Sequence, residues 1–416
     1  MNKHCIIAGL QFENQTDFKE NFEETCSLAE ACGYEVIETM VQPRRSAHPS
    51  TLFGSGKLAE LQTLIHETKI DTLIISSDIT PSQMRTLKDL FKIRILDRTD
   101  LILEIFASRA RTKEARLQVE LATLKHQLPY LIRTVQAFSR QGGVGGARNK
   151  GEGEKQLELD RRKLETRIQA CKRELDSVVN NRDTMRRRRK KAGVPMAALA
   201  GYTNAGKSTL MNALLELCES DQDKQVFVKD MVFATLDTTV RSLNWQRHEF
   251  LLSDTVGFVS NLPHELIKAF QSTLEEVVEA DVILHVIDES SHQREAQKQV
   301  TDSTLEKLKA GDKPIIYVHN KCDLCEFKAN VDNHIYISAA KRQGLNELMD
   351  KINEICYADH RQLTVRIPYD NQEMIRLIQN KLTILSCRQM EDGFHYVIET
   401  VPSFVELLKP YIIEGS

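Results

Sequence analysis

The stretch from Gly201 to Thr209 constrains the fold of this chain more than any other part of it. It reads GYTNAGKST and fits the pattern G-x-x-x-x-G-K-[ST] of the phosphate-binding P-loop. The apolar run Met196–Ala200 before it predicts a buried strand, and the apolar residues after it predict a helix: Leu210, Met211, Ala213, Leu214 and Leu215. A P-loop requires strand, glycine-rich loop and helix in this order, so the sequence predicts an α/β core that binds a nucleoside triphosphate.

The residue types of this loop explain how it would hold phosphate. Gly201 and Gly206 let the backbone approach phosphate oxygens, and the loop N–H groups and the following helix N-terminus attract negative charge. Lys207 would be the catalytic cation at the β- and γ-phosphates, and Ser208 would offer its hydroxyl to Mg²⁺. We predict that the whole loop binds nucleotide: Gly201, Tyr202, Thr203, Asn204, Ala205, Gly206, Lys207, Ser208 and Thr209.

A second motif selects the base. An N-K-x-D sequence follows the apolar run Ile315–Val318, which places it at the carboxyl end of a strand, where ligands of α/β sheets bind. The carboxylate of Asp323 can accept two N–H groups from the Watson–Crick edge of guanine, whereas adenine offers a different pattern. A loop after the last predicted strand would close over the guanine. The predicted base-binding residues are Asn320, Lys321, Cys322 and Asp323, with Ser338, Ala339 and Ala340 in that loop.

A D-T-V-G segment at the end of the run Phe250–Ser253 supplies a further group on the phosphate side. Asp254 would hold Mg²⁺ through water, and the N–H of Gly257 would meet the γ-phosphate. Many GTPases place a water-orienting Gln directly after this segment, but this chain has Phe258, which can neither donate nor accept. We therefore predict slow intrinsic hydrolysis. The predicted contact residues are Asp254, Thr255, Val256 and Gly257.

An F-A-T-L-D segment lies between the P-loop helix and that strand. Thr235 is the predicted second hydroxyl on Mg²⁺, and Thr238 and Thr239 remain open as alternatives. The predicted nucleotide-binding residues here are Phe233, Ala234, Thr235, Leu236 and Asp237. The predicted metal ligands are thus Ser208 and Thr235, with Mg²⁺ as cofactor and GTP as substrate.

Length and composition bound the rest of the chain. Its 416 residues predict several domains, 41% hydrophobic residues support real cores, and a net charge of −3 excludes a chain that is basic throughout. Nine scattered cysteines fit reduced thiols better than a disulfide framework. The N-terminal apolar run is too short for a signal peptide, and no apolar run approaches a membrane span. We expect a cytoplasmic protein, with loose membrane association left open.

Residues 1–112 alternate short apolar runs with amphipathic stretches. This alternation predicts a small parallel α/β domain. The expected strands are Cys5–Leu10, Tyr34–Met40, Thr72–Ser76 and Ile93–Leu96, and the expected helices are Phe18–Cys32, Lys57–Thr68 and Pro81–Leu90.

Residues 113–192 carry two heptad seams around a glycine-rich stretch, Gln141–Gly153. The first seam is Leu117, Leu121, Leu124, Leu128, Leu131, Val135 and Phe138, and the second is Leu157, Leu164, Ile168, Cys171, Leu175, Val178 and Met185. Together they predict an antiparallel helical hairpin with a mobile tip. Pro129 inside the first seam predicts a kink or a break. A dimerisation arm is the alternative interpretation of this hairpin.

The hairpin region is also rich in positive charge. Arg148 and Lys150 lie at its tip, and the run Arg186–Lys191 ends it. Such a run is often only a solvated face. A mobile, basic glycine loop on a stalk can, however, follow a phosphate backbone and recognise the shape of structured RNA. Aromatic residues do not alternate with the basic ones, so base stacking is not predicted.

Two further regions follow. Residues 193–358 carry the motifs above on recurring strand-like runs and predict a doubly wound α/β GTPase domain. Residues 359–416 predict a small α+β C-terminal domain that carries no recognisable chemistry, and the sequence does not indicate whether it contacts the body of the protein. Cys322 and Cys325 form half of a zinc pattern without a second pair, so metal binding there is not predicted.

The order of these motifs resembles the HflX family of ribosome-associated GTPases, in the translation-factor class of P-loop GTPases. The resemblance covers nearly the whole chain. It is carried by Arg116–Leu124 (RLQVELATL), the glycine-rich tip, Gly153–Glu158 (GEKQLE) with Asp160-Arg161-Arg162, and the strings FATLD and DTVGF. The tip departs from the family, which usually reads close to G-x-R-G-P-G-E. Here Ala147–Glu154 intervenes, with Lys150 near the usual Arg and no Pro.

This resemblance implies GTP hydrolysis coupled to binding of the large ribosomal subunit. The hairpin tip, near Gly142–Gly153, would contact ribosomal RNA near the peptidyl transferase centre, and the GTP-bound protein would split stalled or idle ribosomes. The ribosome would accelerate the slow hydrolysis by ordering the switch segments. We expect a monomer. The alternatives are a GTP-switched scaffold whose hairpin binds a protein partner and an ATP-dependent enzyme, which Asp323 argues against.

Overall fold

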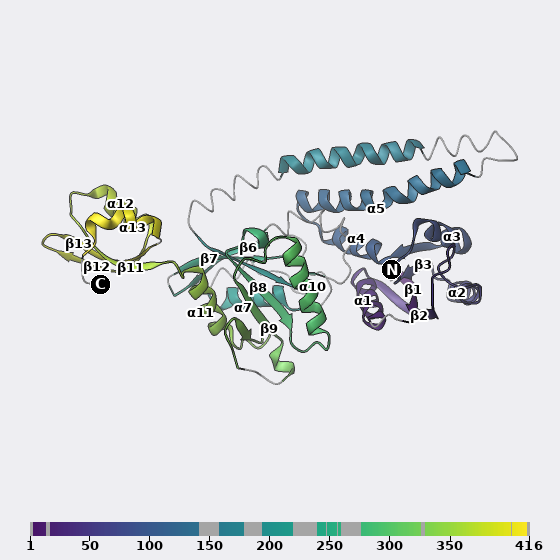
Figure 1. The fold of residues 1–416 in the computed structure, drawn as a ribbon, viewed down its shortest axis with the longest axis horizontal. Helices are drawn as coiled ribbons and strands as arrows, with labels where there is room; N and C mark the ends of the chain where they lie inside the picture. The colour runs from purple at the N-terminus through teal and green to yellow at the C-terminus, as the bar shows by residue number, and fades with distance from the viewer. Residues whose placement is uncertain are drawn as a thin grey trace.

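A computed structural model describes residues 3–13, 17–140, 158–178, 194–218, 239–246, 248–255, 257–258, 276–325, 329–400 and 402–413. Predictions on the hairpin tip, on Phe233–Asp237 and on Val256 lie outside these residues. Three sheets and a pair of long helices make up the described part (Figure 1). The predicted fold class, a P-loop α/β domain preceded by a smaller α/β unit and a helical hairpin, is confirmed.

The N-terminal sheet is parallel, with strand order β2-β1-β3-β4. Its apolar runs form the buried centre, because every residue of β3 and most of β1 is shielded from water. The strands are β1 (Lys3–Phe12), β2 (Tyr34–Arg44), β3 (Thr72–Ile75) and β4 (Arg94–Asp97). The helices are α1 (Phe18–Ala31), α2 (Ser55–Thr68), α3 (Pro81–Phe91) and α4 (Arg98–Arg109). Sequence analysis missed α4, which a reciprocal capping box between Asp97 and Asp100 begins.

The two long helices form the predicted hairpin. Helix α5 (Lys113–Arg140) and the helix of residues 158–178 run side by side (Figure 1). Their predicted seams meet in one apolar cluster: Leu117, Leu121, Leu124, Leu128, Ile168, Cys171 and Leu175. Arg167 and Glu120 join the helices through two hydrogen bonds of 2.5 and 2.8 Å. Of the kink or break expected at Pro129, the break does not occur, since α5 continues through this residue.

The central sheet has six strands in the order β10-β9-β8-β5-β7-β6, and only β6 is antiparallel. The strands are β5 (Met196–Gly201), β6 (Thr239–Trp245), β7 (His248–Asp254), β8 (Val282–Asp288), β9 (Ile315–Asn320) and β10 (His334–Tyr336). Helices α7 (Lys207–Leu217), α10 (Arg294–Lys307) and α11 (Leu345–Cys356) pack against it. The sequence patterns did not predict β6, an edge strand that forms a hairpin with β7.

The C-terminal sheet is antiparallel, with the order β11-β13-β12. Its elements are β11 (Arg361–Ile367), α12 (Gln372–Lys381), β12 (Thr383–Met390), β13 (Gly393–Thr400), α13 (Pro402–Leu408) and the 3₁₀ helix η3 (Lys409–Tyr411). His248 at the start of β7 lies 2.8 Å from Oε2 of Glu399 on β13. The C-terminal unit therefore contacts the body of the protein.

The predicted boundaries near residues 112, 192 and 358 remain proposals. Within the described residues, none of the helices combines the length and the apolar composition that a membrane span needs.

Candidate nucleotide site

The P-loop joins β5 to α7 at the carboxyl end of the central sheet. Gly206, the N-cap of α7, has φ of 93°, and a side chain there would place Cβ 2.2 Å from Nδ2 of Asn320. Gly201 has φ of 152°, and its Cβ would meet the carbonyl oxygen of Val286 at 2.3 Å. A side chain at either position would clash with a neighbouring group, and glycine would also let the backbone approach phosphate closely.

Lys207 and Ser208 follow directly at the start of α7. Nζ of Lys207 donates to the carbonyls of Gly201 at 3.0 Å and Tyr202 at 2.8 Å, inside the loop. Burial lowers the pKa of Lys207 to about 8, although the charge of Asp254 partly opposes this shift. The hydroxyl of Ser208 donates to Oδ2 of the fully buried Asp254 at 2.8 Å. A hydroxyl beside a carboxylate is an oxygen donor set that suits Mg²⁺.

The segment after β7 lies against the P-loop through its main chain. The N–H of Thr203 donates to the carbonyl of Phe258 at 2.8 Å, and the N–H of Phe258 donates to the carbonyl of Gly201 at 3.1 Å. A Cβ on Gly257 would lie 3.0 Å from Nζ of Lys207, so this glycine sits beside the predicted catalytic cation. Phe258 itself is 3% exposed and packs in an apolar cluster with Ala200 of β5 and Ile283 of β8.

Thr255 is buried, and its hydroxyl donates to the carbonyl of Leu199 on β5 at 2.6 Å. Its side chain therefore tethers the segment to the sheet.

Asn320 connects the predicted base-binding loops to the P-loop. Its Nδ2 donates to the carbonyl of Ala205 at 2.9 Å, and its Oδ1 accepts from the N–H of Ala339 at 3.0 Å. Asp323 accepts from the hydroxyl of Ser338 at 2.6 Å, which fixes the carboxylate at the end of β9. The structure thus brings together three segments that lie far apart in the sequence.

The remaining predicted residues in these loops have distinct surroundings. Nζ of Lys321 donates to Asp288 at 2.8 Å. Cys322 is buried with its thiol directed at the carbonyl of His319, 3.1 Å away, and Ala340 is exposed. Glu24 of the N-terminal unit accepts from the hydroxyl of Tyr202 at 2.6 Å, and sequence analysis did not predict this contact. Nothing in the sequence around Glu24 signals this role.

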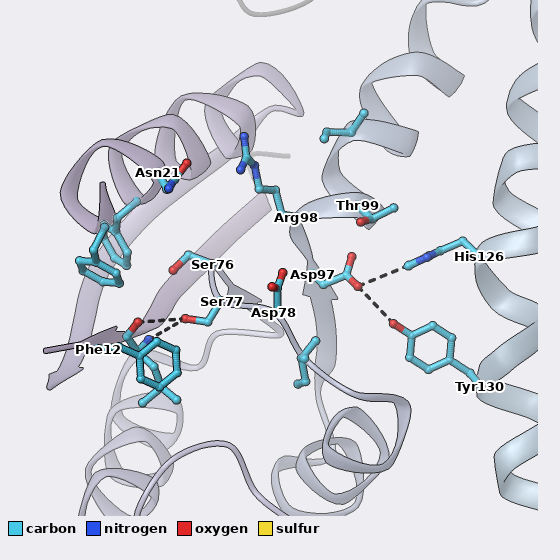
Figure 2. A pocket seen from close by; sticks show the side chains of 15 residues that line it. Phe12, Asn21, Ser76, Ser77, Asp78, Asp97, Arg98, Thr99, His126 and Tyr130 are labelled. Carbon is cyan, nitrogen blue, oxygen red and sulfur yellow. Dashed lines mark hydrogen bonds and ion pairs between the residues drawn. The ribbon is translucent and has the colours of Figure 1, made fainter. Parts of the chain in front are cut away.

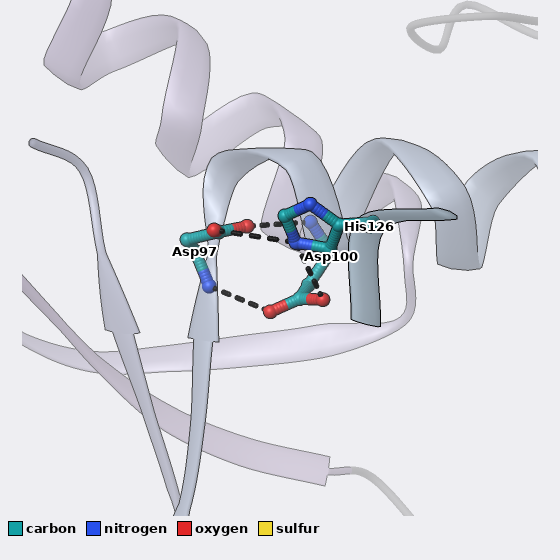
Figure 3. A group of neighbouring side chains, drawn as sticks. All are labelled: Asp97, Asp100 and His126. Atoms are coloured by element: carbon teal, nitrogen blue, oxygen red, sulfur yellow. Dashed lines mark hydrogen bonds and ion pairs between the residues drawn. The ribbon is translucent and has the colours of Figure 1, made fainter. Parts of the chain in front are cut away.

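A possible metal-ligand cluster lies in the N-terminal unit, where single ligand atoms of Asp97, Asp100 and His126 lie within 4.8 Å of one another (Figure 3). Burial lowers the pKa of His126, but hydrogen bonds and charges of Asp100 and Asp97 outweigh it and raise the pKa to about 10. Nε2 of His126 on α5 lies 3.4 Å from Oδ2 of Asp97 and 3.3 Å from Oδ1 of Asp100. These ion-pair contacts join α5 to the end of β4 and the start of α4.

Three family models match consecutive parts of the chain. A model described as the N-terminal region of a GTP-binding GTPase matches residues 19–107, and one for its middle region matches residues 109–189. A model described as a 50S ribosome-binding GTPase matches residues 196–321. The first covers β2 to β4 of the N-terminal sheet, the second covers the hairpin, and the third covers β5 to β9 of the central sheet and ends at Lys321, inside the N-K-x-D motif.

The chain is also similar to complete curated proteins. GTPase HflX of Caldanaerobacter subterraneus subsp. tengcongensis is 39% identical over 95% of this chain and 91% of the relative. GTPase HflX of Escherichia coli strain K12 is 36% identical over 88% of this chain and 86% of the relative. Among solved structures, a GTP-binding protein from Sulfolobus solfataricus in complex with GDP is 25% identical over 85% of this chain and 98% of that chain, with a TM-score of 0.45. The long, nearly complete matches to curated relatives mean that this chain belongs to the HflX family of GTPases.

Proposed function

We propose that this GTPase binds GTP with Mg²⁺ at the carboxyl end of the central sheet and couples its hydrolysis to binding of the large ribosomal subunit in the cytoplasm. The observation that carries GTP binding is the pair of hydrogen bonds made by Asn320. They join the P-loop to the loop at Ala339, whose neighbour Ser338 bonds to Asp323, the residue that would recognise a guanine base.

The residues of the site divide the chemistry between them. Lys207 would leave the two carbonyls that it contacts and pair with the β- and γ-phosphates, because phosphate oxygens are stronger acceptors. Ser208 and Asp254 would hold the metal, and Thr235 is the proposed second hydroxyl. When bound, Mg²⁺ supplies positive charge that offsets the negative charge of the phosphates. The N–H of Gly257, beside Lys207, would donate a hydrogen bond to the γ-phosphate.

The proposed ribosome contact rests on the family and on the hairpin. The family model over residues 196–321 is described as a 50S ribosome-binding GTPase. We propose that the tip, near Gly142–Gly153, contacts ribosomal RNA and that the GTP-bound protein splits stalled or idle ribosomes. The seam residues Leu117, Leu121, Ile168 and Cys171 already pack against each other within the chain. That packing leaves the tip and the charged faces, rather than the seam, to meet a partner.

GTP turnover by the purified full-length chain, with and without purified large ribosomal subunits, tests this proposal. We expect strong stimulation by the subunits, weaker at high salt because phosphate contacts release counterions. Arg148→Gln with Lys150→Gln should lower the stimulation and flatten its salt dependence. Lys172→Gln with Arg173→Gln is the matched control, because it removes the same charge from the exposed face of the helix of residues 158–178.

The scaffold alternative makes the opposite prediction. A hairpin that binds a protein partner would tolerate the tip substitutions, and turnover would not respond to large subunits. That result would leave the GTP site intact and remove the ribosome from the proposal. Equal losses in the tip and control variants would indicate attraction to net charge rather than a tip contact.

A further inference from the structure

Glu24 of α1 joins the N-terminal sheet to the P-loop. The hydroxyl of Tyr202 donates to Oε1 of Glu24 at 2.6 Å, and Nη2 of Arg98 donates to Oε2 of the same carboxylate at 2.6 Å. The side chains of Glu24 and Arg98 are each 14% exposed, and Tyr202 is 8% exposed. Little solvent therefore competes for these hydrogen bonds, and bonds to a charged acceptor are among the stronger ones in proteins.

Tyr202 also reaches the catalytic centre through its main chain. The carbonyl of Tyr202 accepts from Nζ of Lys207 at 2.8 Å, and the backbone of Tyr202 pairs with Phe258 in an isolated β-bridge. Gly201, directly before it, has φ of 152°, so the backbone at this point is one that glycine alone adopts readily. Holding the ring of Tyr202 therefore also restrains the carbonyl against which Lys207 rests.

The other end of this set of contacts lies on the hairpin. Arg98 follows Asp97, whose Oδ2 accepts from the hydroxyl of Tyr130 at 3.1 Å and lies 3.4 Å from Nε2 of His126. Tyr130 and His126 both belong to α5. Figure 2 shows these side chains around a cavity of about 440 Å³, where the carboxyl ends of β1, β3 and β4 meet. Contacts thus continue from α5, through β4 and Glu24, to the P-loop.

We propose that Glu24 is a positioning residue for GTP hydrolysis, which holds Tyr202 and thereby the P-loop backbone around Lys207, and which links that loop through Arg98 to helix α5. This inference rests on the GTPase reaction alone. It requires no ribosome contact, and its test contains no ribosome.

Single-turnover hydrolysis of GTP by excess full-length chain, without ribosomes, is the assay. The variants are Glu24→Ala, Tyr202→Phe and the double variant, with GDP affinity and melting temperature measured on each. Glu20→Ala is the matched control, because Glu20 is an exposed acid one turn earlier on the same helix. Tyr202→Phe keeps the ring and its packing, so it carries the test even if Glu24→Ala impairs folding.

We expect Glu24→Ala and Tyr202→Phe each to lower the rate constant of single-turnover hydrolysis about tenfold, because each removes one hydrogen bond to a charged group. The affinity for GDP should change less than about threefold. The double variant should be no slower than the slower single variant, since both remove the same contact. Glu20→Ala should match the unmodified chain. Rates equal to the control, multiplied losses in the double variant, or GDP affinity that falls in step with the rate would overturn the proposal.

Discussion

At the scale of single residues, the nucleotide site is built from buried polar groups that bond to one another. Asn320 serves two loops, Thr255 bonds to a strand carbonyl, and Ser208 bonds to Asp254. If one partner of such a pair were removed, the other would stay buried without a hydrogen bond to protein or water, which costs free energy of folding. The geometry of the site therefore depends on a few pairs, and single substitutions test them directly.

Asn320→Ala should weaken GDP binding and lower the free energy of unfolding by about 1–3 kcal/mol, because the Ala205 carbonyl and the Ala339 N–H would lose their partner. Isothermal titration with GDP and denaturant unfolding measure the two effects. Asn333→Ala, at a partly exposed position beside β10, is the control. Unchanged affinity and stability would contradict the bridging role of Asn320.

Phe258→Gln should not accelerate hydrolysis without ribosomes, because the side chain at this position is buried in an apolar cluster. Replacing a buried ring by an amide should lower the free energy of unfolding by about 2–4 kcal/mol. Turnover and denaturant unfolding of the same preparation are the measurements. Faster turnover in a variant that keeps its stability would show that the position can reach the reacting water.

At the scale of elements, helix α5 connects two parts of the fold. Its apolar seam packs on the helix of residues 158–178, and His126 and Tyr130 on another face bond to the end of β4. One helix therefore contacts both the second arm of the hairpin and the N-terminal sheet, so a displacement of the arm would act on the sheet as well.

The His126 network gives this contact a pH dependence. The pKa of His126 is about 10 in the folded protein and near 6.5 in an unfolded chain. Protonated His126 therefore stabilises the fold fully below pH 6.5, and this stabilisation is lost as the pH rises through about 10. Asp97, Asp100 and Tyr130 are the groups that face it. The melting temperature of the unmodified chain should exceed that of His126→Gln by several degrees at pH 6. The difference should shrink by pH 10.5.

His66→Gln, at an exposed position near the end of α2, is the control for general effects of histidine removal. A difference between His126→Gln and the unmodified chain that stays constant from pH 6 to 10.5 would mean that the charge of His126 does not contribute.

At the scale of the whole molecule, specific polar contacts join the units. Glu24 and Tyr202 join the N-terminal unit to the P-loop, and His248 joins the central sheet to Glu399 of the C-terminal sheet. His248 is buried, and Nδ1 of its ring also contacts Asn353 at 2.7 Å. These contacts make the arrangement of the units sensitive to single side chains.

Glu399→Ala should loosen the C-terminal unit, because it removes the carboxylate that contacts Nε2 of the buried His248 and costs about 1–3 kcal/mol at that contact. Hydrogen exchange should rise at the start of β7 and in β11, while the N-terminal sheet stays protected. Glu391→Ala, at an exposed position between β12 and β13, is the control. The same exchange in both variants would show that the contact does not hold the units together.

Local patterns were sufficient for much of this fold. Apolar runs and glycine spacing in the sequence predicted β5, the P-loop and α7, and heptad spacing predicted which leucines pack in the hairpin. Helix α4, strand β6 and helix α13 are among the elements that were not predicted. Helix α4 begins at a capping box rather than after a glycine or proline, and β6 is an edge strand with few buried positions.

The sequence by itself determined the chemistry of the nucleotide site, because P-loop, D-x-x-G and N-K-x-D motifs act through local backbone and adjacent side chains. Only the tertiary structure decided which distant groups support that site. Asn320 meets Ala205, and Glu24 meets Tyr202, across 115 and 178 residues of sequence. Such long-range contacts depend on how the sheets and helices pack, and short-range patterns of residues do not predict them.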